Sequence, residues 1–145
     1  LLGRKILGTA GKVMQPFVQQ VQSFCDINQG NALVAQVESS LNKLLELTDV
    51  IGAKAAGNPD EVNAAGVDYL MFAGYTVFAY FWARAALIAE AALKEGSDKA
   101  AFYQAKLATA KFYFSKLLPR IATLELTIKA GAEDLMSIDE DAFSY

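Results

Sequence analysis

Few residues in this chain have the types and spacing that catalysis requires. The 145 residues contain no histidine, which excludes Ser-His-Asp and Cys-His catalysis and the Glu-x-x-His pairs of di-iron bundles. The paired acids that remain are Glu46 with Asp49 and Glu133 with Asp134. They occupy surface-type positions without an apolar pocket that would shift a carboxyl pKa. We interpret both pairs as solvated, and we expect no catalytic residue, no cofactor-binding residue and no metal site in this chain.

Two single residues have a structural and a chemical interpretation. Arg84 is the only charge between Tyr69 and Ala89. An unpaired buried guanidinium is very costly, so we expect Arg84 to lie against a carboxylate or helix-end carbonyls, with ligand binding as the alternative. Cys25 is the only cysteine and lies on an apolar helix face. It predicts a buried structural thiol and a reducing, cytoplasmic compartment.

The glycines near the start resemble a phosphate-binding loop only superficially. Gly3, Gly8 and Gly11 fit neither GxGxxG nor GxxxxGK[ST]. We expect them to terminate helical segments.

Composition favours one all-α domain. Hydrophobic residues make up 54% of the chain and charged residues 20%, which excludes disorder, and proline and β-type alternation are scarce. The length suits a single domain with a substantial core. The net charge is −3, with no basic cluster beyond Arg4-Lys5, so nucleic acid is not an expected partner.

Periodicity and capping signals predict a four-helix up-down bundle. Apolar residues at helical spacing predict a first helix over 12–27 with Pro16 in its first turn, and a second after Asn31 with one wet face. Asn58, Pro59 and Glu61 mark the start of a third helix, which reaches Glu95 and spans ~55 Å. A fourth begins after Ser97, and it either kinks at Pro119 or restarts there toward Ala130, before Gly131.

The third helix is unusually apolar. Its segment YLMFAGYTVFAYFWARAALIA could span a bilayer by length. Arg84 lies inside it, and a charge near the bilayer centre costs about 2.5–3.5 kcal/mol, so we favour a buried helix without membrane insertion. Such a helix must be covered on nearly every side, which predicts a further surface from another domain or subunit. Close helix approach is the expected reason for Gly66 and Gly74.

We divide the chain into residues 1–10, the end of an upstream helix or linker; 11–136, the bundle; and 137–145, an acidic tail. The tail has Ser137 and Glu140 at capping-box spacing and Phe143 and Tyr145 as candidate anchors on the body. The chain has no initiator methionine, and we expect it to be a fragment of a longer protein.

Five segments together carry a family resemblance. LLGRKIL, NPDEVNAAGVDYL, AYFWARAALIAEAAL, FYQAKLATAKFYFSKLLPR and AGAEDLM, in this order and spacing, resemble the extra C-terminal domain of a bacterial acyl-CoA dehydrogenase subfamily. The resemblance implies a mostly antiparallel helical bundle appended to a dehydrogenase body.

The resemblance also implies what the parent does. Such enzymes bind FAD and oxidise an acyl-CoA thioester to the 2,3-enoyl form: a glutamate removes the α-proton, and a β-hydride passes to the flavin. Electrons then usually pass to an electron-transfer flavoprotein. In the family the base lies in a Tyr-Glu-Gly-Thr segment shortly before the stretch that matches Leu2 to Lys5, so no catalytic residue is carried over to this chain. Arg4 and Lys5 could lie at the rim of the parent's active site or play a surface role.

Two functions follow as hypotheses. The first is a non-catalytic C-terminal domain that covers the body or a subunit interface of an FAD-dependent acyl-CoA dehydrogenase, with homo-oligomerisation expected. The alternative is a free-standing helical module whose apolar third helix docks a partner.

Overall fold

The computed structural model describes residues 1–143, without the side chain of Glu140. Within that range every regular element is helical, so the predicted all-α class is confirmed. The long helices are α2 (Ala32–Ala55) and α3 (Asp60–Lys94); shorter ones are α1 (Gln15–Ile27), α4 (Ala100–Phe112), α5 (Ile121–Ala130) and α6 (Glu133–Met136). Short helical turns cover Leu2–Ile6, Leu7–Thr9, Tyr113–Leu117, Leu118–Arg120 and Glu140–Phe143.

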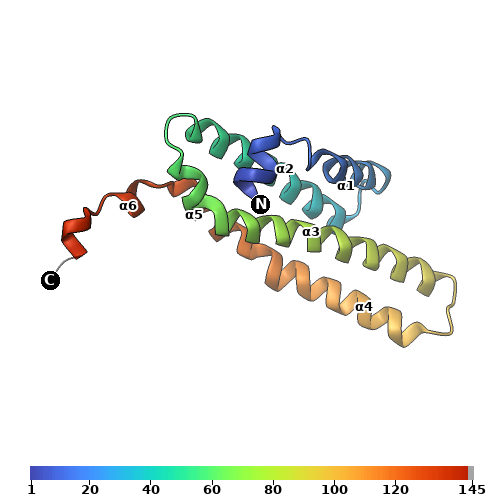
Figure 1. Ribbon diagram of the computed structural model, residues 1–145. Coiled ribbons are helices and arrows are strands. Elements are labelled where there is room, and N and C mark those ends of the chain that lie inside the picture. Colours follow the sequence, from blue (N-terminus) through green and yellow to red (C-terminus); the bar gives the residue numbers. More distant parts are fainter. Residues whose placement is uncertain (144–145) are drawn as a thin grey trace.

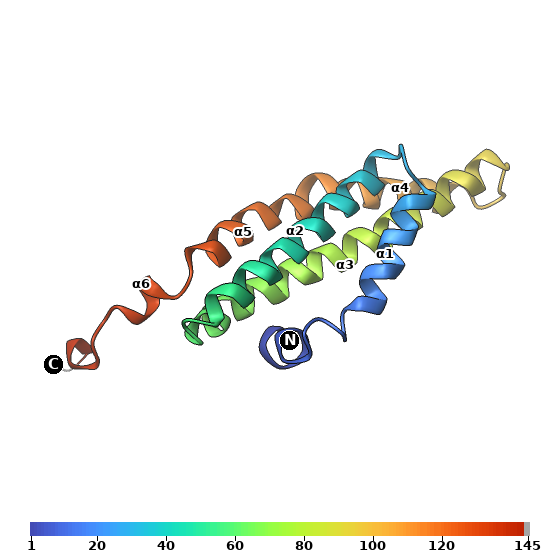
Figure 2. The ribbon, with the colours of Figure 1, turned by 90° about the horizontal axis from the view of Figure 1, so that it is seen from above.

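Three rods lie side by side, with α1 set obliquely across one end (Figures 1 and 2). The rods are α2, α3 and the continuous run of α4 and α5, which we call the α4–α5 rod; α3 contacts the other two. Helix α1 packs against α2. The turn Leu2–Ile6, which we call the N-terminal turn, packs against α3. The predicted succession of antiparallel helices therefore describes these three rods, whereas α1 departs from an up-down bundle.

The first two helices begin as their sequences predict. Pro16 lies in the first turn of α1, where its missing N–H has no helical partner to lose. The Oδ1 atom of Asn31 accepts hydrogen bonds from the N–H groups of Leu33 at 2.9 Å and Val34 at 3.3 Å. Asn31 is therefore the N-cap of α2.

The start of α3 uses part of the predicted capping box. Oδ1 of Asn58 accepts from the N–H of Asp60 at 3.1 Å. The Glu61 carboxylate does not return to the cap; it lies 3.8 Å from Lys54 Nζ instead. A cation on the preceding helix competes successfully for this carboxylate, because an ionic partner is stronger than a neutral N–H.

The α4–α5 rod resolves the alternative at Pro119. The α-helical pattern ends at Phe112, passes through a wider turn at Tyr113–Leu117 and a tight turn at Leu118–Arg120, and resumes in α5. Pro119 has no N–H to offer the preceding turn, so the local hydrogen bonding is rearranged without ending the rod. Gly131 follows α5 with φ +82°, as expected of a terminating glycine.

The core consists of two clusters that share α3. One joins α1, α2, α3 and the Tyr113–Leu118 region; its largest members are Leu41, Tyr80, Tyr113 and Phe114. The other joins the N-terminal turn, α2, α3 and α5 around Leu47, Tyr69 and Phe72. Buried alanines of α3 face its neighbours and allow close packing; they are Ala65, Ala73, Ala79, Ala83, Ala86 and Ala89.

The first residues of the chain pack against this core, whereas the described residues at the C-terminal end do not. Leu2 and Ile6 are buried, so the first ten residues pack on the bundle. The acidic tail leaves the bundle after α5 (Figures 1 and 2). The predicted anchor Phe143 is 70% exposed and contributes no anchor; Tyr145 lies outside the described residues.

The predicted capping box in the tail is also wrong at Ser137. Its hydroxyl donates to the Asp134 carbonyl at 3.2 Å, whereas Asp139 Oδ1 accepts from the N–H of Asp141 before the last turn. The side chain of Glu140 lies outside the described residues. Asp139, immediately before that turn, is better placed to cap it.

Candidate functional site

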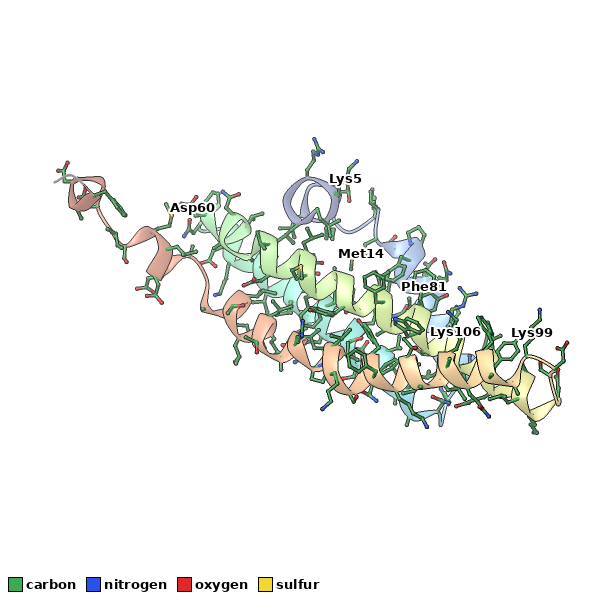
Figure 3. The ribbon with its side chains drawn as sticks, turned by 90° about the horizontal axis from the view of Figure 1, so that it is seen from below. Lys5, Met14, Asp60, Phe81, Lys99 and Lys106 are labelled. Carbon is green, nitrogen blue, oxygen red and sulfur yellow. The ribbon has the colours of Figure 1, made fainter. Side chains whose placement is uncertain are left out.

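The most distinctive surface of the described chain is an apolar face on α3. Six large side chains recur there at helical spacing and are 48–72% exposed; they are Val67, Leu70, Met71, Phe78, Phe81 and Ile88. We call these six residues the outer face of α3. Figure 3 shows Phe81 on this helix. A face of this composition is typical of a surface that another protein covers.

Two grooves lie at the outer face, one beside it and one that includes Leu70, Met71 and Phe78 in its lining. One, with a volume of about 220 Å³, separates it from the N-terminal turn and α1, and is lined by Leu1, Lys5, Val13, Phe17 and Val77 among others. The second, of about 370 Å³, lies on the side of the α4–α5 rod. Its lining includes Gly74, Tyr75, Tyr113, Leu117 and Arg120. One mainly apolar hollow therefore lies beside the outer face, and the other runs over part of it.

Gly66 and Gly74 do not serve the helix contacts predicted for them. A Cβ placed on either glycine would meet nothing within 4 Å. The prediction is wrong within this chain, because neither glycine touches a neighbouring helix.

Gly3 is also misassigned as a helix terminator. Gly3 lies inside the N-terminal turn, where an added Cβ would approach Val62 to 3.2 Å. The close approach of this turn to α3 therefore explains why a glycine stands there. Gly11, by contrast, lies in a turn with φ +77°.

Arg84 differs from its prediction in both burial and partner. Its side chain is exposed, and Nη1 donates to the Tyr80 hydroxyl at 3.3 Å while the guanidinium lies 5.4 Å from the Tyr80 ring centroid. None of the carboxylates whose side chains the structure describes forms an ion pair with it. Because water solvates the guanidinium, no buried counter-charge is required. The cation–π contact with Tyr80 stands where an ion pair was predicted.

The polar side-chain atoms buried around α3 have partners within the described bundle. The Tyr113 hydroxyl donates to the Tyr75 carbonyl at 2.6 Å, and the Tyr69 and Thr48 hydroxyls lie 2.7 Å apart. Burial raises the pKa of both Tyr113 and Tyr69 above the usual tyrosine value, which keeps their hydroxyls protonated. Lys106 of α4 is labelled in Figure 3. It lies over the rings of Trp82 and Phe102, with its Nζ 5.8 and 5.3 Å from their centroids. The contacts of Tyr113, Tyr69 and Trp82 join α3 to its neighbours, and these contacts offer no reactive group.

The acid pairs lie at the surface, as predicted. Glu46, Asp49, Glu133 and Asp134 are all exposed. Glu46, however, belongs to a cluster that the sequence analysis missed. Lys43 and Lys129 each contact both Glu46 and Glu125, at distances of 2.7–3.1 Å.

This cluster joins α2 to α5, with residues 83 positions apart in direct contact. Hydrogen bonds from the lysines lower the pKa of Glu46 and Glu125. The i,i+3 and i,i+4 spacings within each helix were visible in the sequence, but the pairing between helices depends on the tertiary structure.

Cys25 is buried, as predicted for a structural thiol. Its Sγ lies 4.0 Å from the Val34 carbonyl, and burial raises the pKa of the thiol. A thiol in this state is a poor nucleophile. Among the residues that the structure describes, no three His, Cys, Asp or Glu side chains gather as a metal site would require.

Arg4 and Lys5 are both exposed, and Lys5 points outward from the N-terminal turn (Figure 3). It also borders the groove that contains Leu1. Their position at the rim of the parent's active site stays a prediction.

The apolar character of α3 raises the question of whether this helix could span a membrane. Of the helices in residues 1–143, only α3 is long and apolar enough to cross a bilayer, a property that the core helix of a globular protein shares. Ten of its residues are buried against the rest of the bundle. The outer face is thus one side of a helix whose other sides are already packed.

Comparison with known proteins identifies the family. The family described as "Acetyl-CoA dehydrogenase C-terminal like" matches residues 17–139. This chain belongs to that family of C-terminal domains found in acyl-CoA dehydrogenases. The predicted resemblance is confirmed.

Two relatives show how this domain is placed. The broad-specificity linear acyl-CoA dehydrogenase of Mycobacterium tuberculosis is 31% identical over 154 aligned residues, which cover 97% of this chain and 25% of the relative. The 3-methylmercaptopropionyl-CoA dehydrogenase of Ruegeria pomeroyi is 30% identical over 142 residues, covering 94% of this chain and 24% of the relative. The chain therefore spans about a quarter of the length of these relatives, at their C-terminal end.

Proposed function

We propose that this chain is the non-catalytic C-terminal structural domain of an FAD-dependent acyl-CoA dehydrogenase. The observation that carries the proposal is the family match over residues 17–139, combined with relatives of which the chain covers only a quarter. The parent would oxidise an acyl-CoA thioester to its 2,3-enoyl form. Its base and flavin site belong to the portion that this chain does not include.

The two hollows beside the first residues of the chain do not suit a flavin. A cavity of about 590 Å³ lies beside Gly11, Met14, Thr48, Asp49 and Gly52. Its lining contains an acid and no cation, which is the wrong charge for a diphosphate. The groove that contains Lys5 is smaller and otherwise apolar. We therefore assign no step of the reaction to residues 1–143.

Several features of the parent belong to the same proposal. It works in the cytoplasm, forms a homo-oligomer and passes electrons to an electron-transfer flavoprotein. The lone buried thiol supports a reducing compartment. The absence of a basic cluster in the sequence supports a protein that binds no nucleic acid. The packed sides of α3 support a bundle that does not insert into a membrane.

A second function is favoured by the outer face of α3 alone. A free-standing helical module would use the same apolar residues to bind a partner helix or a second copy. The two functions differ in what the gene encodes before Leu1. About 400 or more preceding residues, ending in a Tyr-Glu-Gly-Thr-like motif, would exclude the free-standing module.

The test uses the full-length product of the gene. Its flavin absorbance is recorded, and bleaching by a panel of acyl-CoA thioesters is measured with and without residues 1–145. We expect flavin and bleaching in the intact protein. If bleaching survives deletion, the domain has an accessory structural role; if flavin or turnover is lost, it supports the cofactor or subunit interface. An intact protein without flavin would contradict the proposal.

A further inference from the structure

We propose that the outer face of α3 is the surface against which the preceding dehydrogenase portion of the parent packs. This inference rests on the proposed function, which makes residues 1–145 the C-terminal part of a longer chain. It adds which face of the bundle is covered, and by what. The occupant is the polypeptide that precedes Leu1.

The composition of the face supports a permanent partner. Its six large side chains are all uncharged and occur over 22 residues of one helix, a span whose charged residues are Asp68 and Arg84. Phe72 and Tyr80 on the opposite side of α3 are buried, so the same helix is apolar toward the core and toward solvent. A continuous apolar helix face that stays exposed to water is unfavourable, because burying apolar surface lowers the free energy.

The shape of the face also suits a docked segment. Gly74 lies between Met71 and Phe78 and has open space where a side chain would be. One groove runs over this part of the face, and the other lies beside it. Absence of a side chain at Gly74, within this groove, allows another backbone to come close, as it does at small residues in helix contacts generally.

Continuity of the chain identifies the occupant. Leu1 is 56% exposed and lines the groove beside the outer face, together with Ala73 and Val77 of α3. A polypeptide that enters at Leu1 therefore arrives at the edge of this face. The curated relatives have about three quarters of their length outside the region that matches this chain. That is ample protein to cover it.

The charges at the edges of the face argue against self-pairing. Lys5 borders one groove and Arg120 the other, and Arg84 is exposed about one helical turn after Phe81 on α3. A two-fold contact through this face would set a cation-bordered surface against another copy of itself. A partner with acidic groups around an apolar centre is the better complement.

The experiment is photo-crosslinking in the full-length protein. The variant Phe81→p-benzoylphenylalanine places a photoreactive ring on the outer face, and the same substitution at Phe78 gives a second position. The matched control is Phe112, which is 56% exposed against 52% for Phe81. It follows buried Ala110 by two residues on α4 and so points away from the bundle. Crosslinked peptides are identified by mass spectrometry.

We expect residues 81 and 78 to crosslink to peptides that precede Leu1, at least tenfold more than residue 112 does. Crosslinks to residues 60–90 of a second copy, to lipid, or only to adjacent residues of the same bundle would overturn the inference. Equal crosslinking from residue 112 would also overturn it. Flavin absorbance is measured on the same samples. Flavin without the expected crosslinks rejects the docking face alone, whereas absence of flavin rejects the proposed function.

Discussion

Helices α2 and α3 are neighbours in the same bundle, but α2 exposes polar side chains to solvent and α3 exposes apolar ones. The buried side of α2 carries Val37, Leu41, Leu44 and Leu47, while its outer side carries charged and amide groups, including Lys43 and Glu46 in ion pairs with α5. The outer side of α3 carries aromatic and aliphatic side chains instead. Both helices are packed toward the core. The difference shows that α2 is complete within this chain, whereas α3 has a second surface that suits a protein partner.

The largest expected effect separates the inner and outer sides of α3. Phe72 is fully buried, whereas Phe78 is 58% exposed. Phe72→Ala should lower the free energy of unfolding by about 3–5 kcal/mol because it leaves a cavity. Phe78→Ala should change the stability of the bundle itself by no more than about 0.5 kcal/mol. Urea unfolding of the 145-residue chain, followed by circular dichroism, measures both; equal losses would show that Phe78 belongs to the core.

A second comparison concerns two glycines with left-handed backbone. Gly30 has φ +87° and open space where a side chain would begin, whereas Gly131 has φ +82° and would place a Cβ 2.8 Å from Glu61 Oε2 and 3.0 Å from Lys54 Nζ. Gly30→Ala should cost about 1 kcal/mol of stability. Gly131→Ala should cost about 2–3 kcal/mol, because strain adds to displacement of an ion pair. A larger loss at Gly30 than at Gly131, in the same urea experiment, would contradict this account of the α5 terminus.

A third pair of substitutions tests the outer face without altering its large side chains. Gly66→Ala and Gly74→Ala both fill open space on α3, and each should stabilise the bundle by up to about 1 kcal/mol through helix propensity. In the full-length protein Gly74→Ala should lose this gain, because Gly74 faces the docked portion, while Gly66→Ala keeps it. Thermal unfolding of the two full-length variants provides the comparison. Equal gains would argue that nothing packs closely at Gly74.

The smallest effect concerns the ion pairs between α2 and α5. Lysine contacts lower the pKa of Glu46 and Glu125, so their stabilisation is present above the unfolded-state pKa and is lost as pH falls through the folded-state pKa. The pKa values of Lys43 and Lys129 are raised, so their contribution is lost as pH rises through the raised values.

Exposed ion pairs are also screened by salt. The double variant Glu46→Gln with Glu125→Gln should therefore remove much of the salt dependence of unfolding near neutral pH. The matched control is Asp49→Asn, an exposed acid of α2 outside the cluster. An unchanged salt dependence in the double variant would mean that the cluster contributes nothing to stability.

Local sequence signals predicted where helices begin and end better than they predicted which side chains meet between helices. The Asn31 cap, Pro16 in the first turn of α1 and the end of α5 at Gly131 depend on neighbouring residues and were predicted correctly. Glu61 and Arg84 were assigned wrong partners, because their partners depend on which helix lies beside them and on how much water reaches them. The cluster that includes Lys129 was missed for the same reason.

The candidate site was predicted in part. The sequence showed that α3 is too apolar for a simple amphipathic helix, and hence that a further surface should cover it. It did not show which side would stay uncovered. That side is fixed by the positions of α2, the α4–α5 rod and the N-terminal turn around α3, so Phe81 could be separated from Tyr80 only in the folded chain.

The central claim is that the rest of the parent covers the outer face of α3. Oxidative footprinting of the unmodified full-length protein tests it with two methionines as internal probes. Met71 lies on the outer face and is 48% exposed in this chain, whereas Met136 of α6 is 62% exposed. If the account is correct, Met71 is oxidised at least tenfold more slowly than Met136. Similar oxidation of the two, as their exposures in the isolated chain imply, would contradict it.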